Sequence, residues 1–144
     1  MPVVSRSFRV DPAPSTVVRY LSDFGNAEEW DPGTVSCTRT DAGPVRVGAS
    51  WRNVSRFAGR DTELSYTLER LTADTIVFVG RNKGATSTDT IAVAADGAGS
   101  KVTYRAHLAL HGAAALLSPA VKLIFEKVAT DTVRQLTVVL NALP

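Results

Sequence analysis

Hydrophobic residues recur mainly with a period of two between Thr34 and Leu110, and with a helical period from Gly112 to the end of the chain. Turn signals rich in glycine, proline and aspartate divide the first region into six segments of strand length. No connection between these segments is long enough for a crossover helix, so neighbouring strands are expected to run antiparallel. The sequence therefore predicts six consecutive antiparallel strands and then one amphipathic helix of about 25 residues.

Shorter elements precede this pattern. Residues 3–10 alternate between apolar and polar side chains and stop at two prolines, which predicts a first strand. Val17, Leu21 and Phe24 then recur at helical spacing, and the segment around Trp30 is suited to one further helical turn. A chain of 144 residues has room for one ordinary core, so we expect a single domain over residues 1–144.

Composition and charge exclude several function classes. Cys37 is the only cysteine, which argues against a disulfide framework and a cysteine-based zinc site, and we expect neither a metal nor a cofactor. The 16 basic and 14 acidic residues are scattered, so nucleic acid is not an expected partner. No segment has the length and apolarity of a transmembrane span, and the N-terminus lacks a signal-peptide pattern. We therefore expect a cytoplasmic protein, and the oligomeric state, monomer or homodimer, stays open.

The order of elements resembles the START-like (SRPBCC) superfamily, which includes birch-pollen-allergen-like proteins and polyketide cyclase/dehydratase-type proteins. The resemblance covers the whole chain and also rests on FRVDPAPSTVV from Phe8 and EWDP from Glu29. It implies an α+β helix-grip fold, in which a curved seven-stranded antiparallel sheet wraps around a long C-terminal helix and two short helices follow the first strand. It also implies a cavity for a small hydrophobic ligand between the sheet and the last helix.

Turn lengths predict the register of the strands, and the register decides which side chains face the helix. We assign loops of two residues at 58–59, three at 72–74, two at 83–84 and four at 97–100. With these loops the apolar faces of successive strands coincide. The predicted pairs are Trp51 with Tyr66, Asn53 with Leu64, Tyr66 with Gly80, Leu68 with Phe78, Phe78 with Asp89, and Asp89 with Leu108.

This register yields a set of candidate ligand-binding residues on the concave face of the sheet and on the last helix. Asp89 stands out among them, because its carboxyl would lie between Phe78 and Leu108, where desolvation raises the pKa. If its strand begins later, near Thr90, Asp89 is instead a solvated residue at the mouth of the cavity. The candidates are Trp51, Asn53, Leu64, Tyr66, Phe78, Asn82, Asp89, Tyr104, Leu108, Ile124 and Val128.

Three functions are compatible with these residues. The leading hypothesis is the binding of a lipid, a polyketide or a similar hydrophobic metabolite. The second is a cyclase or dehydratase in which Asp89 acts as acid and base while Tyr66 or Tyr104 polarises a carbonyl. The third is an interaction module that uses the exposed face of the sheet, or the apolar residues 113–117, to contact a protein or a membrane surface.

Overall fold

The computed structural model describes residues 3–57, 59–112 and 118–144. The apolar residues 113–117, a possible interaction patch in the sequence, lie outside these ranges. In chain order the elements are β1 (Val3–Val10), α1 (Pro14–Ser22), the 3₁₀ turn η1 (Phe24–Asn26), α2 (Ala27–Trp30), β2 (Thr34–Arg39), β3 (Ser50–Phe57), β4 (Arg60–Leu71), β5 (Thr75–Arg81), β6 (Ala85–Asp96), β7 (Gly99–Leu110) and α3 (Ser118–Asn141).

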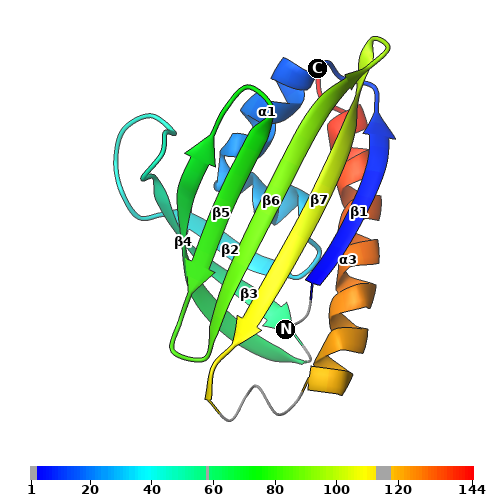
Figure 1. The fold of residues 1–144 in the computed structure, drawn as a ribbon. Helices are drawn as coiled ribbons and strands as arrows, with labels where there is room; N and C mark the ends of the chain where they lie inside the picture. Colours follow the sequence, from blue (N-terminus) through cyan, green and yellow to red (C-terminus); the bar gives the residue numbers. More distant parts are fainter. Residues whose placement is uncertain (1–2, 58, 113–117) are drawn as a thin grey trace.

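The seven strands form one antiparallel sheet in the order β1-β7-β6-β5-β4-β3-β2. The sheet curves strongly, so that β2 and β3 cross the molecule behind β5, β6 and β7 (Figure 1). All the helices lie on the same side of the sheet, with α3 running beside β1 (Figure 1). This arrangement confirms the predicted helix-grip fold with its curved seven-stranded sheet.

The core lies between the inner face of the sheet and the helices. Every second residue is buried from Ser87 to Val93 on β6 and from Ser100 to Ala106 on β7, as expected for a sheet with one covered face. The long helix α3 contributes Ala129, Thr132, Leu136 and Leu140, whose spacing of three and four residues places them on one buried stripe. None of the described helices has both the length and the hydropathy that crossing a bilayer requires.

The predicted register is confirmed from β3 to β6, although one turn differs from expectation. Trp51 pairs with Tyr66, Tyr66 with Gly80, and Phe78 with Asp89. The β4–β5 turn holds two residues instead of three, because the Thr72 amide donates to the Thr75 carbonyl at 2.9 Å. A bulge between Leu68 and Arg70 takes up the additional residue, so the faces stay as predicted.

The β6–β7 turn is also shorter than expected, and this corrects one predicted pair. Asp96 pairs with Gly99, so that Asp89 lies opposite Ala106, and Leu108 lies opposite Ser87. Gly99 is the first residue of β7, and a larger residue would not fit there, because a Cβ would lie 2.4 Å from the Val10 carbonyl oxygen. Since the register differs from the prediction by two residues, every side chain keeps its face.

The close packing of Tyr66 on Gly80 predicts that one methyl group added at position 80 destabilises the protein. A Cβ at Gly80 would lie 2.6 Å from the ring carbons of Tyr66, which is itself buried. Gly80→Ala should therefore lower the free energy of unfolding by about 1–3 kcal/mol, measured by urea denaturation. Gly84→Ala is the matched control, because its Cβ would meet nothing closer than the Asn82 side chain at 3.7 Å. Equal stability of the two variants would contradict the close packing of the Tyr66 ring.

Candidate functional site

A group of buried polar side chains interrupts the apolar inner face of the sheet. Ser87 and Asp89 point inward from β6, since they alternate with the outward-facing threonines of that strand. Tyr66 from β4 and Tyr104 from β7 face the same interior, and all four side chains are less than 10% exposed. Together with Asp31, discussed below, we call these residues the inner polar cluster.

Asp89 is the most strongly perturbed carboxyl in this cluster. It is 6% exposed, between Phe78 on β5 and Ala106 on β7. Its pKa is raised to about 7, mainly by burial and to a lesser degree by the negative charge of Asp31, while the hydroxyls of Tyr104 and Ser87 oppose the rise by donating hydrogen bonds. A carboxyl with such a pKa can exchange a proton near neutral pH. The structure thus places Asp89 within β6 on the buried face, and the alternative of a solvated residue near the strand's beginning is wrong.

Asp31 is a member of the cluster that the sequence analysis did not single out. It follows α2 directly, and its carboxyl accepts hydrogen bonds from the Gly33 amide and the Thr34 hydroxyl, both at 3.0 Å. This Asx-type turn fixes the side chain where the chain enters β2. Desolvation raises the pKa of Asp31, and the two hydrogen bonds partly offset this effect. By exposed area Asp31 is half-buried. The signal in the sequence was an aspartate followed by Pro32 and Gly33, which predicts a turn but not a carboxyl that faces the interior.

The two tyrosines keep their protons at neutral pH. Burial raises the pKa of Tyr66 and of Tyr104, and the negative charge of Asp89 raises both further. Each hydroxyl is therefore a permanent hydrogen-bond donor next to a carboxyl that titrates. Such a pairing is suited to holding a carbonyl or hydroxyl oxygen.

Asn53 has a different role from the one its inward position suggested. Its side chain is 2% exposed and is fully occupied by neighbours. The amide nitrogen donates to the Thr34 hydroxyl at 3.3 Å, and the amide oxygen accepts from the Ser55 hydroxyl at 2.5 Å. Asn53 therefore links β3 to the turn that holds Asp31, and it acts as a support for the cluster.

Aromatic side chains surround the cluster on the side of the short helices. Trp51 packs against Phe78 with ring centroids 5.7 Å apart, and Phe24 lies between Trp51 and Tyr66. Trp30 packs edge-on against Tyr104 with ring centroids 6.1 Å apart, whereas the sequence predicted only a helical turn around Trp30. Its indole N–H is buried and has no hydrogen-bond partner among the described residues. Trp30 is thus a further donor beside the cluster.

Of the remaining candidate residues, four are buried or half-buried and one is exposed at the surface. Leu64 is buried, Leu108 is half-buried opposite Ser87, and Ile124 and Val128 are half-buried on α3. Asn82 corrects the expectation, because it is exposed and its amide oxygen accepts from the backbone amides of Gly84 and Ala85 at 2.8 Å. It shapes the β5–β6 turn and is not brought to the cluster.

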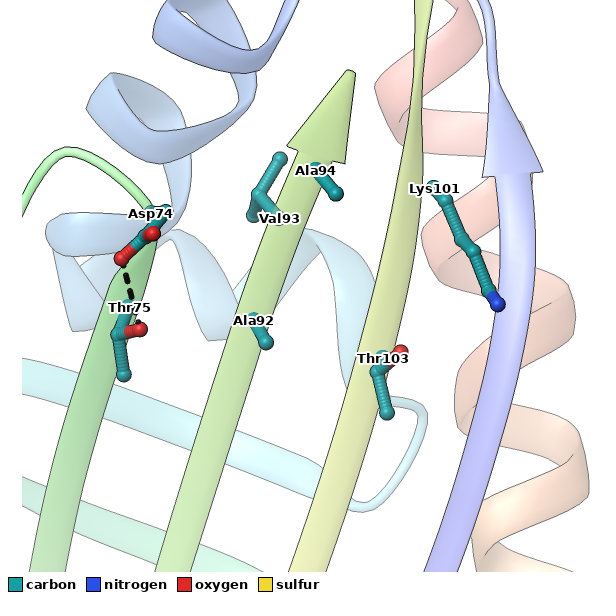
Figure 2. Close-up of a pocket in the computed structure, with 7 residues that line it drawn as sticks. All are labelled: Asp74, Thr75, Ala92, Val93, Ala94, Lys101 and Thr103. Carbon is teal, nitrogen blue, oxygen red and sulfur yellow. Dashed lines mark hydrogen bonds between the residues drawn. The ribbon is translucent and has the colours of Figure 1, made fainter. Parts of the chain in front are cut away.

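The sheet also has a depression of about 280 Å³ on its outer face, away from the helices (Figure 2). Its lining is Asp74, Thr75, Ala92, Val93, Ala94, Lys101 and Thr103. The Asp74 carboxylate is already engaged by the hydroxyls of Thr72 and Thr75, both at 3.0 Å. The depression arises where small alanine side chains lie between longer neighbours, and its polar groups do not converge on a common point. It lacks the features of a ligand site that the inner polar cluster has.

Comparison with known proteins supports the architecture. Residues 1–140 match the family described as polyketide cyclase / dehydrase and lipid transport. No protein with a curated description matches the sequence. Within the described residues, no group of three or more His, Cys, Asp or Glu side chains is arranged to hold a metal ion.

Several solved structures share the fold at low sequence identity. A START superfamily protein from Mycobacterium smegmatis has a TM-score of 0.82 at 13% identity, with 99% of each chain covered. A protein of Thermus thermophilus has a TM-score of 0.79 at 16% identity, with 94% of each chain covered. The Zhui aromatase/cyclase of a Streptomyces species has a TM-score of 0.76 at 12% identity, covering 94% of this chain and 90% of that one. At these identities the likeness shows the fold alone.

Proposed function

The chain belongs to the polyketide cyclase / dehydrase and lipid transport family, and from this premise we propose that it binds a small, largely apolar molecule between the inner face of the sheet and α3. The observation that carries the proposal is the inner polar cluster. A carboxyl and two phenols with raised pKa values lie on an otherwise apolar, buried face. Binding sites for small molecules typically combine an apolar lining with a few such polar groups. In this proposal residues 1–144 act as one domain.

The N-terminal half of α3 supplies the other wall of the proposed site. Val128 and Gln135 lie seven residues apart, on the same side of the helix. Gln135 donates from its side chain to the Glu29 carbonyl at 3.2 Å, so this side of α3 faces α2. Val128 lies two turns earlier on the same side of α3, and Ile124 lies one turn before it. Their half-exposed apolar surfaces are suited to covering a bound hydrophobic molecule.

Catalysis of the cyclase or dehydratase type is a second candidate function, favoured by the pKa of Asp89. A group that titrates at about 7 can both accept and return a proton at neutral pH. The neutral hydroxyl of Tyr104 next to it would polarise a carbonyl oxygen of the substrate. Binding and catalysis would use the same residues, so the binding experiment comes first.

The neutral probe N-phenyl-1-naphthylamine tests the proposed site. The wild-type protein should bind one probe molecule, followed by the rise in probe fluorescence. Val128→Trp places a larger ring in the proposed site and should weaken binding by about tenfold or more. Val138→Trp is the matched control on the same helix, because Val138 is 59% exposed. Equal affinities of the two variants would contradict the site, and native mass spectrometry of the purified protein would show whether a natural ligand is retained.

A further inference from the structure

We infer that the inner polar cluster selects an apolar ligand whose polar group is a protonated amine, and that it rejects carboxylates. This inference rests on the proposed function, since it names the chemical class of ligand for the same site. It follows from the distribution of charge between the interior and the surface of the molecule.

Within the described residues, the interior holds the buried carboxyl of Asp89 and the half-buried carboxyl of Asp31 but no Lys or Arg side chain. None of the 16 Lys and Arg side chains, all within the described residues, is buried. Fourteen are exposed, and the other two, Arg6 and Arg39, are half-buried and already paired. Arg6 binds Glu126 at 2.7 Å, and Arg39 binds Asp41. A ligand carboxylate would therefore find no counter-ion beside Asp31 and Asp89.

Titratable groups from several elements surround Asp89, and each of them is either negative or neutral. Asp31, from the turn between α2 and β2, acts on Asp89 and on both tyrosines through its charge. The other titratable groups nearby are Tyr66 on β4, Tyr104 on β7 and Cys37 on β2, none of which carries a positive charge. On α3 the charged groups are paired at the surface, Glu126 with Arg6 and Asp131 with Lys127 and Arg134, or exposed, as in Lys122.

An ammonium group would supply the positive charge that the cluster lacks. It has three N–H donors, which match the carboxyl oxygens of Asp89 and Asp31 and the hydroxyl oxygen of Tyr104. An alcohol would use some of these acceptors without neutralising the charge, and a carboxylate would add a third negative group to a desolvated site. The expected order of affinity is amine, then alcohol, then acid.

Three naphthalene derivatives of similar size test this order. We would measure the binding of 2-(aminomethyl)naphthalene, 2-naphthalenemethanol and 2-naphthoic acid by calorimetry at pH 8, where most Asp89 carboxyls are ionised. The wild-type protein should bind the amine at least tenfold more tightly than the alcohol, and the acid most weakly. Asp89→Asn should remove the preference for the amine while the affinity for the alcohol changes by less than about threefold.

Control variants separate the role of the cluster from general effects of charge and folding. Asp96→Asn removes an exposed carboxylate from the same strand and should keep the amine preference. Asp31→Asn should reduce that preference as well, which keeps the test valid if Asp89→Asn does not fold, as judged by circular dichroism. Equal affinity of the wild-type protein for amine and alcohol, or tighter binding of the acid, would overturn this inference alone. Failure of all three compounds to bind would overturn the proposed function with it.

Discussion

Asp89→Asn should stabilise the protein more and more as the pH rises from 5 to 8. The pKa of Asp89 is raised to about 7 from its ordinary 3.8, so ionisation of this carboxyl opposes folding. This destabilisation is absent below pH 3.8, the ordinary pKa. It grows as the pH rises from 3.8 to about 7, the pKa in the folded protein, and is constant at higher pH. At its full extent it amounts to about 4 kcal/mol, of which about 2–3 kcal/mol develops between pH 5 and pH 8.

Urea denaturation of the variant and the wild type across this range measures the difference in unfolding free energy. Asparagine keeps the size of the side chain and an oxygen that accepts from Tyr104 and Ser87, so no cavity forms. Asp96→Asn is the control, because this carboxylate is exposed and should show no comparable trend. A difference that stays constant between pH 5 and pH 8 would mean that Asp89 ionises as a solvated group does.

The inward-facing side of each strand could be predicted although the lengths of two turns were wrong. In the β4–β5 hairpin a bulge compensates for the error, and in the β6–β7 hairpin the register moves by two residues, so each side chain keeps its face. Sequence analysis placed Asp89 next to Phe78 through a two-residue turn, and the structure confirms that pair. The predicted partner on β7 was wrong because Gly99 looks like a turn glycine, whereas in the structure it is a strand residue whose missing side chain leaves room for the Val10 carbonyl of β1. Contacts between the two ends of the chain have no local signature, so turn counting could not detect this one.

The candidate site could be predicted only where it depends on alternation within strands. Tyr66, Asp89 and Tyr104 follow the alternation and are buried as expected. Ser87 follows the same alternation two residues before Asp89, although it was not among the predicted site residues. Asp31 could not be found in this way, since it lies in a turn, where alternation gives no signal, and local hydrogen bonds to Gly33 and Thr34 set the position of its carboxyl. Asn82 did carry a local signal, because an asparagine before Lys83 and Gly84 is typical of a side-chain-capped turn.

If the protein is an enzyme of the cyclase type, Asp89→Asn should lower its turnover by about 100-fold or more, while ligand affinity changes little. A suitable assay is the cyclisation of 2,6-heptanedione to 3-methylcyclohex-2-enone, followed by the absorbance of the enone. In this reaction ionised Asp89 would take a proton from the carbon next to one carbonyl, and that carbon would attack the other carbonyl. The hydroxyl of Tyr104 would stabilise the oxygen that becomes negative. Protonated Asp89 would return its proton to this oxygen, which gives a hydroxyl. Ionised Asp89 would then take the second proton from the same carbon and pass it to the departing hydroxyl, so that water and the enone form.

Two further variants distinguish proton transfer from simple positioning. Tyr104→Phe should lower turnover less than Asp89→Asn, because Asp89 and its proton remain. Asp31→Asn removes a neighbouring negative charge that raises the pKa of Asp89, so the acidic limb of the pH–rate profile should move to lower pH. A positioning role alone would lower the rate without moving that limb. If the wild-type protein binds apolar ligands but does not accelerate cyclisation, and Asp89→Asn changes affinity alone, the buried carboxyl serves ligand recognition and not proton transfer in this reaction.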